Sequence, residues 1–218
     1  MTRISRLSIA ALSLAALGLC ACGANESAAA PTAAQAPSAV DMAKLNAKLP
    51  VLTGADVWTM DRQKSKLTFD AYYNGDFTGQ FTRFQTAIKL SPDALEAAEI
   101  HAVIDLTSVA AKDDDVRANL LTKDWFHTAL HPYAVFSSKQ VSREAGGGYL
   151  AAGTLTIKGI SKPVNLPFSL TINGGNASAK GSTTLSRMNF NVGEGSDFAG
   201  EDWVKFGVTI NVDIEASK

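Results

Sequence analysis

The chain has 218 residues, of which 46% are hydrophobic and 19% are charged, and a formal net charge of −1. This composition is typical of a globular protein, and the length suffices for one substantial domain or two small ones. A net charge near zero gives no basic field to attract phosphate, so nucleic acid is not expected as a partner.

The N-terminus carries the pattern of an export signal. Two arginines precede the apolar run Leu7 to Leu19, which is short for a membrane span. We therefore predict a signal peptide over residues 1–21. The run ends in a segment that resembles the lipobox of bacterial lipoproteins, and Cys22 is the expected lipidation site because the small Ala21 precedes it. The alternative is ordinary cleavage that yields a soluble secreted protein.

The segment after the signal is predicted to connect an anchor to a folded domain. Residues 22–52 form an Ala- and Pro-rich tether and lead-in, because residues 23–38 hold one charge and no large apolar side chain. A short helix is expected within residues 40–52, and the domain is placed at residues 53–218. Both cysteines lie before the tether, so the domain is expected to lack a disulfide and a thiolate metal site.

Beyond residue 57, apolar and polar residues alternate, which is the pattern of strands with one dry face. Turn residues such as Asn74-Gly75 and the Gly146–Gly148 run separate these segments. Strands are predicted at residues 67–73, 77–90, 98–106, 133–141, 149–157, 164–172, 177–185 and 204–214.

These strands predict an all-β fold, an antiparallel barrel or sandwich of about eight strands. A closed barrel is favoured because closure removes exposed edges. One short helix is expected at Asp113–Leu121, where an acidic start suits the positive end of the helix. Pro167 cannot donate to a ladder and should lie at a bulge or an unpaired edge, where the barrel opens. Such a barrel can be filled with side chains or hold a ligand.

Five ordered motifs between Trp58 and Ile214 resemble the YceI-like family of bacterial periplasmic proteins and lipoproteins. The motifs lie at Trp58–Phe69, Gly79–Phe84, Asp124–Phe136, Gly153–Gly159 and Leu185–Phe190. The resemblance implies a lipocalin-like barrel that binds polyisoprenoids or related long-chain amphiphiles without catalysis and without a cofactor.

The resemblance further implies a cavity whose wall binds the ligand. Trp125 and Phe126 are of particular interest because rings on a short helical segment could form a movable lid. Lys158 and Arg187 are candidate cations for a ligand head group, with surface solvation or an internal carboxylate pair as the alternative. For a single apolar residue, ordinary core packing is the stronger expectation. The candidate wall residues are Phe69, Tyr73, Phe84, Trp125, Phe126, Phe136, Leu155, Phe168, Phe206 and Ile210.

Catalytic and metal sites find little support. His127 and His131 have helical spacing and could bind zinc with His101, but Pro132 disfavours that geometry. The acidic run Asp113–Asp115 lacks the ligand spacing of a calcium loop. Without a nucleophile elbow or a phosphate loop, we predict a protein that is not an enzyme and holds no metal.

The expected function is to bind, transport or sequester an isoprenoid or another long-chain lipid in the bacterial envelope. The protein is placed in the periplasm and tethered through Cys22, in the outer membrane if the source has two membranes. A homodimer is left open. The alternative function is that of a side-chain-filled barrel acting as a stress-response or protein-interaction module.

Overall fold

The structure is a computed structural model that describes residues 39–218. The signal peptide, Cys22 and the first part of the tether lie outside the described residues. Two α-helices, α1 (Ala39–Asn46) and α2 (Asp114–Leu121), accompany four short 3-10 helices, η1 (Leu95–Ala97), η2 (Leu106–Ser108), η3 (Arg187–Phe190) and η4 (Ser196–Phe198). The strands are β1 (Val57–Met60), β2 (Lys66–Tyr72), β3 (Asp76–Phe81), β4 (Phe84–Lys89), β5 (Glu99–Asp105), β6 (Val109–Ala110), β7 (Tyr133–Arg143), β8 (Tyr149–Ile157), β9 (Ile160–Asn173), β10 (Asn176–Ser186) and β11 (Gly207–Ser217).

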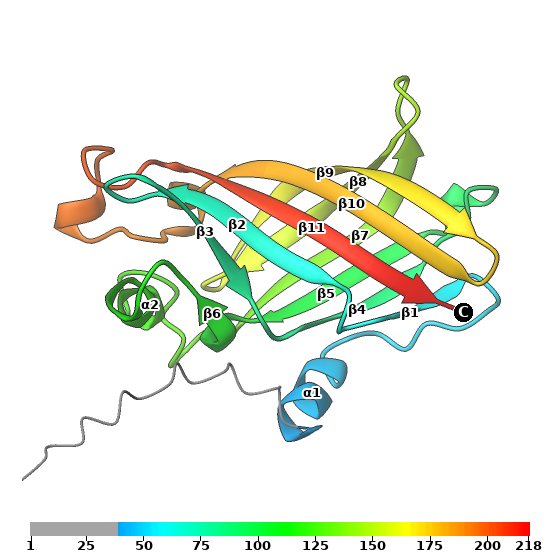
Figure 1. Ribbon diagram of the computed structural model, residues 1–218, viewed down its shortest axis with the longest axis horizontal. Coiled ribbons are helices and arrows are strands. Elements are labelled where there is room, and N and C mark those ends of the chain that lie inside the picture. The colour runs from blue at the N-terminus through cyan, green and yellow to red at the C-terminus, as the bar shows by residue number, and fades with distance from the viewer. Residues whose placement is uncertain (1–38) are drawn as a thin grey trace, which may run out of the picture. The chain divides into compact units, whose positions relative to one another are not determined.

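The strands form one antiparallel sheet that closes on itself (Figure 1). The ring runs β1-β4-β5-β7-β8-β9-β10-β11, and β1 pairs with β11 to complete it. The short strands β2, β3 and β6 continue β1, β4 and β5, because β2 pairs with β11 and β3 while β6 pairs with β3. Counted as continuous strands, the sheet confirms the predicted eight-stranded antiparallel barrel.

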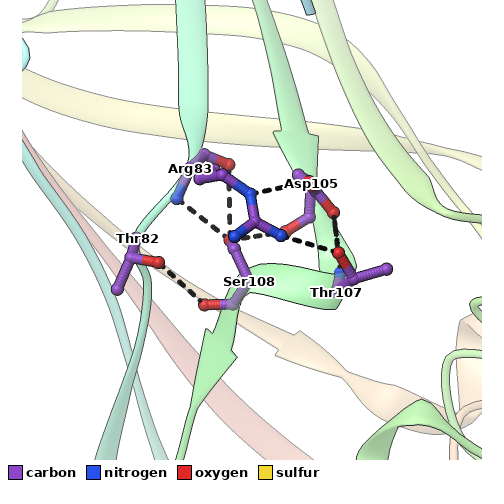
Figure 2. Close-up of polar contacts among 5 residues, drawn as sticks. All are labelled: Thr82, Arg83, Asp105, Thr107 and Ser108. Atoms are coloured by element: carbon purple, nitrogen blue, oxygen red, sulfur yellow. Dashed lines mark hydrogen bonds and ion pairs between the residues drawn. The ribbon is translucent and has the colours of Figure 1, made fainter. Parts of the chain in front are cut away.

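Two of the long strands are interrupted, one between β3 and β4 and one between β5 and β6. Hydrogen bonds between polar groups connect these two interruptions, as Figure 2 shows. Arg83 Nε donates to Asp105 Oδ2 at 2.9 Å, and Arg83 Nη2 donates to Thr107 Oγ1 at 2.8 Å. The Arg83 amide donates to Ser108 Oγ at 3.0 Å, and Thr82 Oγ1 donates to the Ser108 carbonyl at 3.2 Å. These bonds satisfy polar groups at the points where the strand ladder is interrupted. The strand expected at residues 77–90 is therefore two strands.

Helix α1 packs on the outer face of the barrel. It buries Met42 and Leu45 against Val103, which points outward between the inward-facing Ala102 and Ile104. The helix expected within residues 40–52 is thus part of the folded unit, which begins before the predicted boundary at residue 53.

The inward-facing side chains form three clusters that follow one another along the barrel. The packed-end cluster contains Trp58, Leu90, Ala98, Phe136, Val141, Tyr149, Ala151, Val164, Phe168, Ala177 and Ala216. The middle cluster contains Met60, Phe84, Ile104, Leu106, Ala134 and Ile214. The lid cluster contains Phe69, Val109 and Leu120, with Trp125 and Phe126 packed against them. Ile88 and Ala102 join the first two clusters, and Phe81 and Phe126 join the last two.

Candidate ligand-binding cavity

A cavity of about 260 Å³ lies inside the barrel, and residues of all three clusters line it, from Phe136 and Val164 of the packed-end cluster to Phe69 and Leu120 of the lid cluster. Its wall is built by alternation, because every second residue of a strand points inward. On β4, for example, Phe84, Thr86 and Ile88 line the cavity while Gln85 and Ala87 do not. Such a wall favours an apolar occupant. Within residues 39–218, the only lining residues with a polar side-chain atom are Tyr73, Thr86, Asn119, Trp125, Thr183 and Arg187.

One end of the cavity is covered by two segments that are fastened to each other. Helix α2 and residues 187–206 lie at the same end of the barrel (Figure 1). The Gly193 amide donates to the Asp124 carbonyl at 2.8 Å, and the Trp125 ring lies 5.2 Å from that of Phe198. The Phe126 ring lies 6.0 Å from that of Phe81 on β3. These contacts place Trp125 and Phe126 in the cover, and the idea that the cover moves stays a prediction.

Helix α2 has the start that its acidic residues predict. The Asp113 carboxylate accepts the Val116 amide at 2.8 Å, so Asp113 is the N-cap of a helix that begins at Asp114. The helix directs Val116, Asn119 and Leu120 at the cavity.

Arg187 organises the other covering segment from within. Its side chain is buried, and the guanidinium lies over the Phe206 ring, 5.4 Å from its centre. Burial lowers the pKa of Arg187, against an opposing influence of Glu201. Every donor group of Arg187 is engaged with protein acceptors, and its assignment to a ligand head group stays a prediction. The side-chain nitrogens donate to six backbone carbonyls, those of Val192, Gly193, Phe198, Gly200, Val204 and Lys205.

Lys158 is engaged in the same way. Its Nζ donates to the Asn191 carbonyl at 2.7 Å and to Glu194 Oε1 at 2.8 Å, with a longer contact of 3.4 Å to the Asp124 carbonyl. An ammonium group has three donors, and these partners use all three. Lys158 therefore joins the hairpin turn between β8 and β9 to the cover, and its assignment to a ligand head group stays a prediction.

The barrel wall has a gap between β9 and β10, which we call the β9–β10 gap. β9 pairs with β8 over residues 160–168, but it pairs with β10 only over residues 168–173. Residues 182–186 of β10 pair with β11 alone. Pro167 lies directly at the start of the gap, which confirms the predicted unpaired edge. Cavity-lining leucines, Leu166 and Leu185, stand on its two sides.

Nearly the whole barrel lies within the region that matches a protein-family model. The model of the YceI-like domain matches residues 58–216. The chain belongs to the YceI-like family. A relative in Yersinia enterocolitica, UPF0312 protein YE1254, is 30% identical over 96 residues, and a UPF0312 protein of Yersinia pestis is 31% identical over the same length. These matches cover 44% of this chain, and the chain spans about half the length of these relatives.

Solved structures show the same YceI-like fold. BcnA of Burkholderia cenocepacia is 29% identical, with a TM-score of 0.69 over 72% of this chain and 99% of that chain. A polyisoprenoid binding domain from Saccharophagus degradans is 16% identical, with a TM-score of 0.58 over 73% and 97%. The YceI protein of Campylobacter jejuni is 20% identical, with a TM-score of 0.57 over 64% and 84%.

Eight of the ten predicted wall residues line the cavity of this YceI-like barrel: Phe69, Tyr73, Phe84, Trp125, Phe126, Phe136, Leu155 and Ile210. Phe168 points inward but does not line the cavity, because its ring stacks on Tyr149 at 5.4 Å within the packed-end cluster. Phe206 precedes β11, which begins at Gly207 rather than Val204, and its ring covers Arg187 instead of the cavity. A direct contact of the eight with a ligand stays a prediction.

The sequence interpretation missed other parts of the YceI-like wall. Phe190, Val192 and Phe198 line the cavity from the covering segment, which has no period-two pattern that would reveal them. Phe77 and Phe81 lie on β3, where alternation is a usable signal.

The histidines do not assemble into one cluster. The rings of His127 and His131 lie 5.8 Å apart, whereas His101 Nδ1 is 3.0 Å from Ser137 Oγ, with Nε2 3.4 Å from Glu99 Oε2. Among residues 39–218, no group of three His, Cys, Asp or Glu is placed to hold a metal ion. Within the same residues, no helix has the length and apolar character of a transmembrane span.

Proposed function

We propose that the protein binds an isoprenoid or another long-chain lipid inside its barrel and carries or sequesters it without catalysis. The observation that supports this function best is the continuous apolar wall of the cavity. Burial of apolar ligand surface contributes about 25 cal/mol per Å², from which the cost of association is subtracted. A long tail offers more such surface than a compact molecule of the same polarity.

The comparisons support the same class of ligand. One structural relative is described as a polyisoprenoid binding domain, and its likeness to this chain extends over 73% of the chain. The alternative function, a barrel filled with side chains, is less well supported, because a cavity of about 260 Å³ lies inside the barrel.

The proposed place of action is the bacterial envelope. An export signal with a lipobox at Cys22 supports a periplasmic protein tethered to a membrane. A single acyl chain gives weak anchoring, and the additional chains of a lipoprotein would make it stable. Cells that express the full chain with labelled palmitate should yield a labelled protein. Unchanged labelling in Cys22→Ala would contradict this anchor.

The proposed ligand can be sought in the purified protein. The full chain, isolated from the envelope fraction of a bacterial host, should yield about one long-chain lipid per barrel in native mass spectra. The same lipid should appear in the organic extract of the unfolded protein. A barrel that is empty after isolation and that also fails to bind prenyl and acyl probes would refute the function.

A further inference from the structure

One polar atom in the cavity wall lacks a partner. Thr86 Oγ1 is buried and has no hydrogen-bond partner among the described residues. Thr86 lies on β4 between Phe84 and Ile88, and all three line the cavity. A buried hydroxyl without a partner is unfavourable, whereas Val has nearly the same shape and no such penalty. Packing alone therefore gives no reason for threonine at this position.

Thr86 lies deep in the cavity, between Phe84 of the middle cluster and Ile88, which contacts the packed-end cluster. Its register partner on β5 is Ala102, which in turn pairs with Phe136 on β7. Ala102 and the next inward residue of β4, Ile88, join the middle cluster to the packed-end cluster. Ile88 and Ile100 line the cavity one inward step beyond Thr86, so a ligand that fills the cavity meets the Thr86 hydroxyl along its deeply buried part.

We propose that Thr86 is a hydrogen-bonding subsite for a neutral oxygen-bearing group on the deeply buried part of the ligand. This inference rests on the proposed function. A threonine hydroxyl both donates and accepts, so it suits an alcohol, a ketone or an ester oxygen. The substrate class is then a neutral long-chain amphiphile whose polar group enters the barrel.

The surroundings select against a charged group at this depth. The neighbours of Thr86 in the wall are apolar, and the two cations near the cover, Lys158 and Arg187, have all their donors bound to protein groups. A buried carboxylate or phosphate would therefore lack a counterion, which is highly unfavourable.

A matched pair of probes isolates this contact. Dodecane and 1-dodecanol differ by one hydroxyl, and both can be titrated against a fluorescent dye displaced from the full-length protein. The preference for 1-dodecanol over dodecane should be roughly fivefold to tenfold greater in the wild type than in Thr86→Val, as for one net hydrogen bond. Thr86→Ser should retain the preference. Thr171→Val, an exposed position on β9, should match the wild type.

The outcomes separate this inference from the function itself. Equal preferences in the wild type and Thr86→Val, with both probes bound, would overturn the subsite and leave the lipid-binding function intact. Failure of every variant to bind either probe would refute the function first. Without ligand, Thr86→Val should melt about 2–4 °C higher than the wild type because an unpaired hydroxyl is removed. A lower melting temperature would instead indicate a structural partner for the hydroxyl and would also overturn the subsite.

Discussion

Arg187→Ala is expected to lower the free energy of unfolding by at least about 3 kcal/mol, because hydrogen bonds from a charged donor are worth about 1.5–3 kcal/mol each. The substitution leaves six carbonyls of residues 192–205 without their donor and removes the cation from the Phe206 ring. Urea unfolding gives the stability. Limited proteolysis should show new cleavage within residues 187–206, because the guanidinium that binds the backbone carbonyls of this segment is removed.

Two further variants serve as controls for Arg187→Ala. Arg187→Lys keeps the charge but has fewer donors and no planar fork, so it should recover only part of the stability. Arg62→Ala, at an exposed position before β2, should change stability by less than about 0.5 kcal/mol. If Arg187→Ala unfolds like Arg62→Ala and resists proteolysis, the covering segment is held by other contacts.

Ala102→Phe is expected to weaken ligand binding at least about tenfold, which corresponds to about 1.4 kcal/mol, while the barrel stays folded. Ala102 lines the cavity from β5 at the level of Thr86, and a phenyl ring there would occupy space that the ligand needs. The ring fills a hollow rather than a packed core, so the loss of stability should remain below the roughly 1–3 kcal/mol usual for overpacking. Titration with 1-dodecanol and urea unfolding measure the two effects.

The matched control is Ala152→Phe. Ala152 lies on β8 between Ala151, which is buried, and Gly153, and it is not among the residues that line the cavity. The same ring on the outer face should leave both affinity and co-purified lipid unchanged. If Ala102→Phe is folded and binds as tightly as Ala152→Phe, the ligand lies outside the barrel.

The fold could be predicted well because strand alternation is a local signal. In β11 the alternation is unbroken, and Val208, Ile210, Val212 and Ile214 all line the cavity. The pattern also includes Val204, but the prediction that the strand starts there is wrong. The Arg187 amide donates to the Phe206 carbonyl, and β11 begins at the next residue, Gly207. The long-range partner of a residue is invisible to a local pattern.

The site was predicted less completely for two physical reasons. Alternation shows which side chains point inward, but not which levels of the barrel are packed, so Phe168 and Phe136 look equivalent in the sequence. A cation such as Lys158 looks free in the sequence, and only the fold shows that a carbonyl 33 residues away along the chain accepts one of its bonds.

The β9–β10 gap also leaves a strand edge that another chain could pair with. An unpaired strand invites pairing with another chain, which leads to aggregation. The Pro167 carbonyl faces Gly181 of β10. In an antiparallel strand the N–H and C=O of one residue point to the same side, so the N–H that Pro167 lacks would have faced β10. Pro163, four residues earlier, lacks an N–H on the same side. Lys162 adds a charge at the same edge. This edge is therefore a poor template for an incoming strand, although β10 leaves it unpaired along residues 160–167.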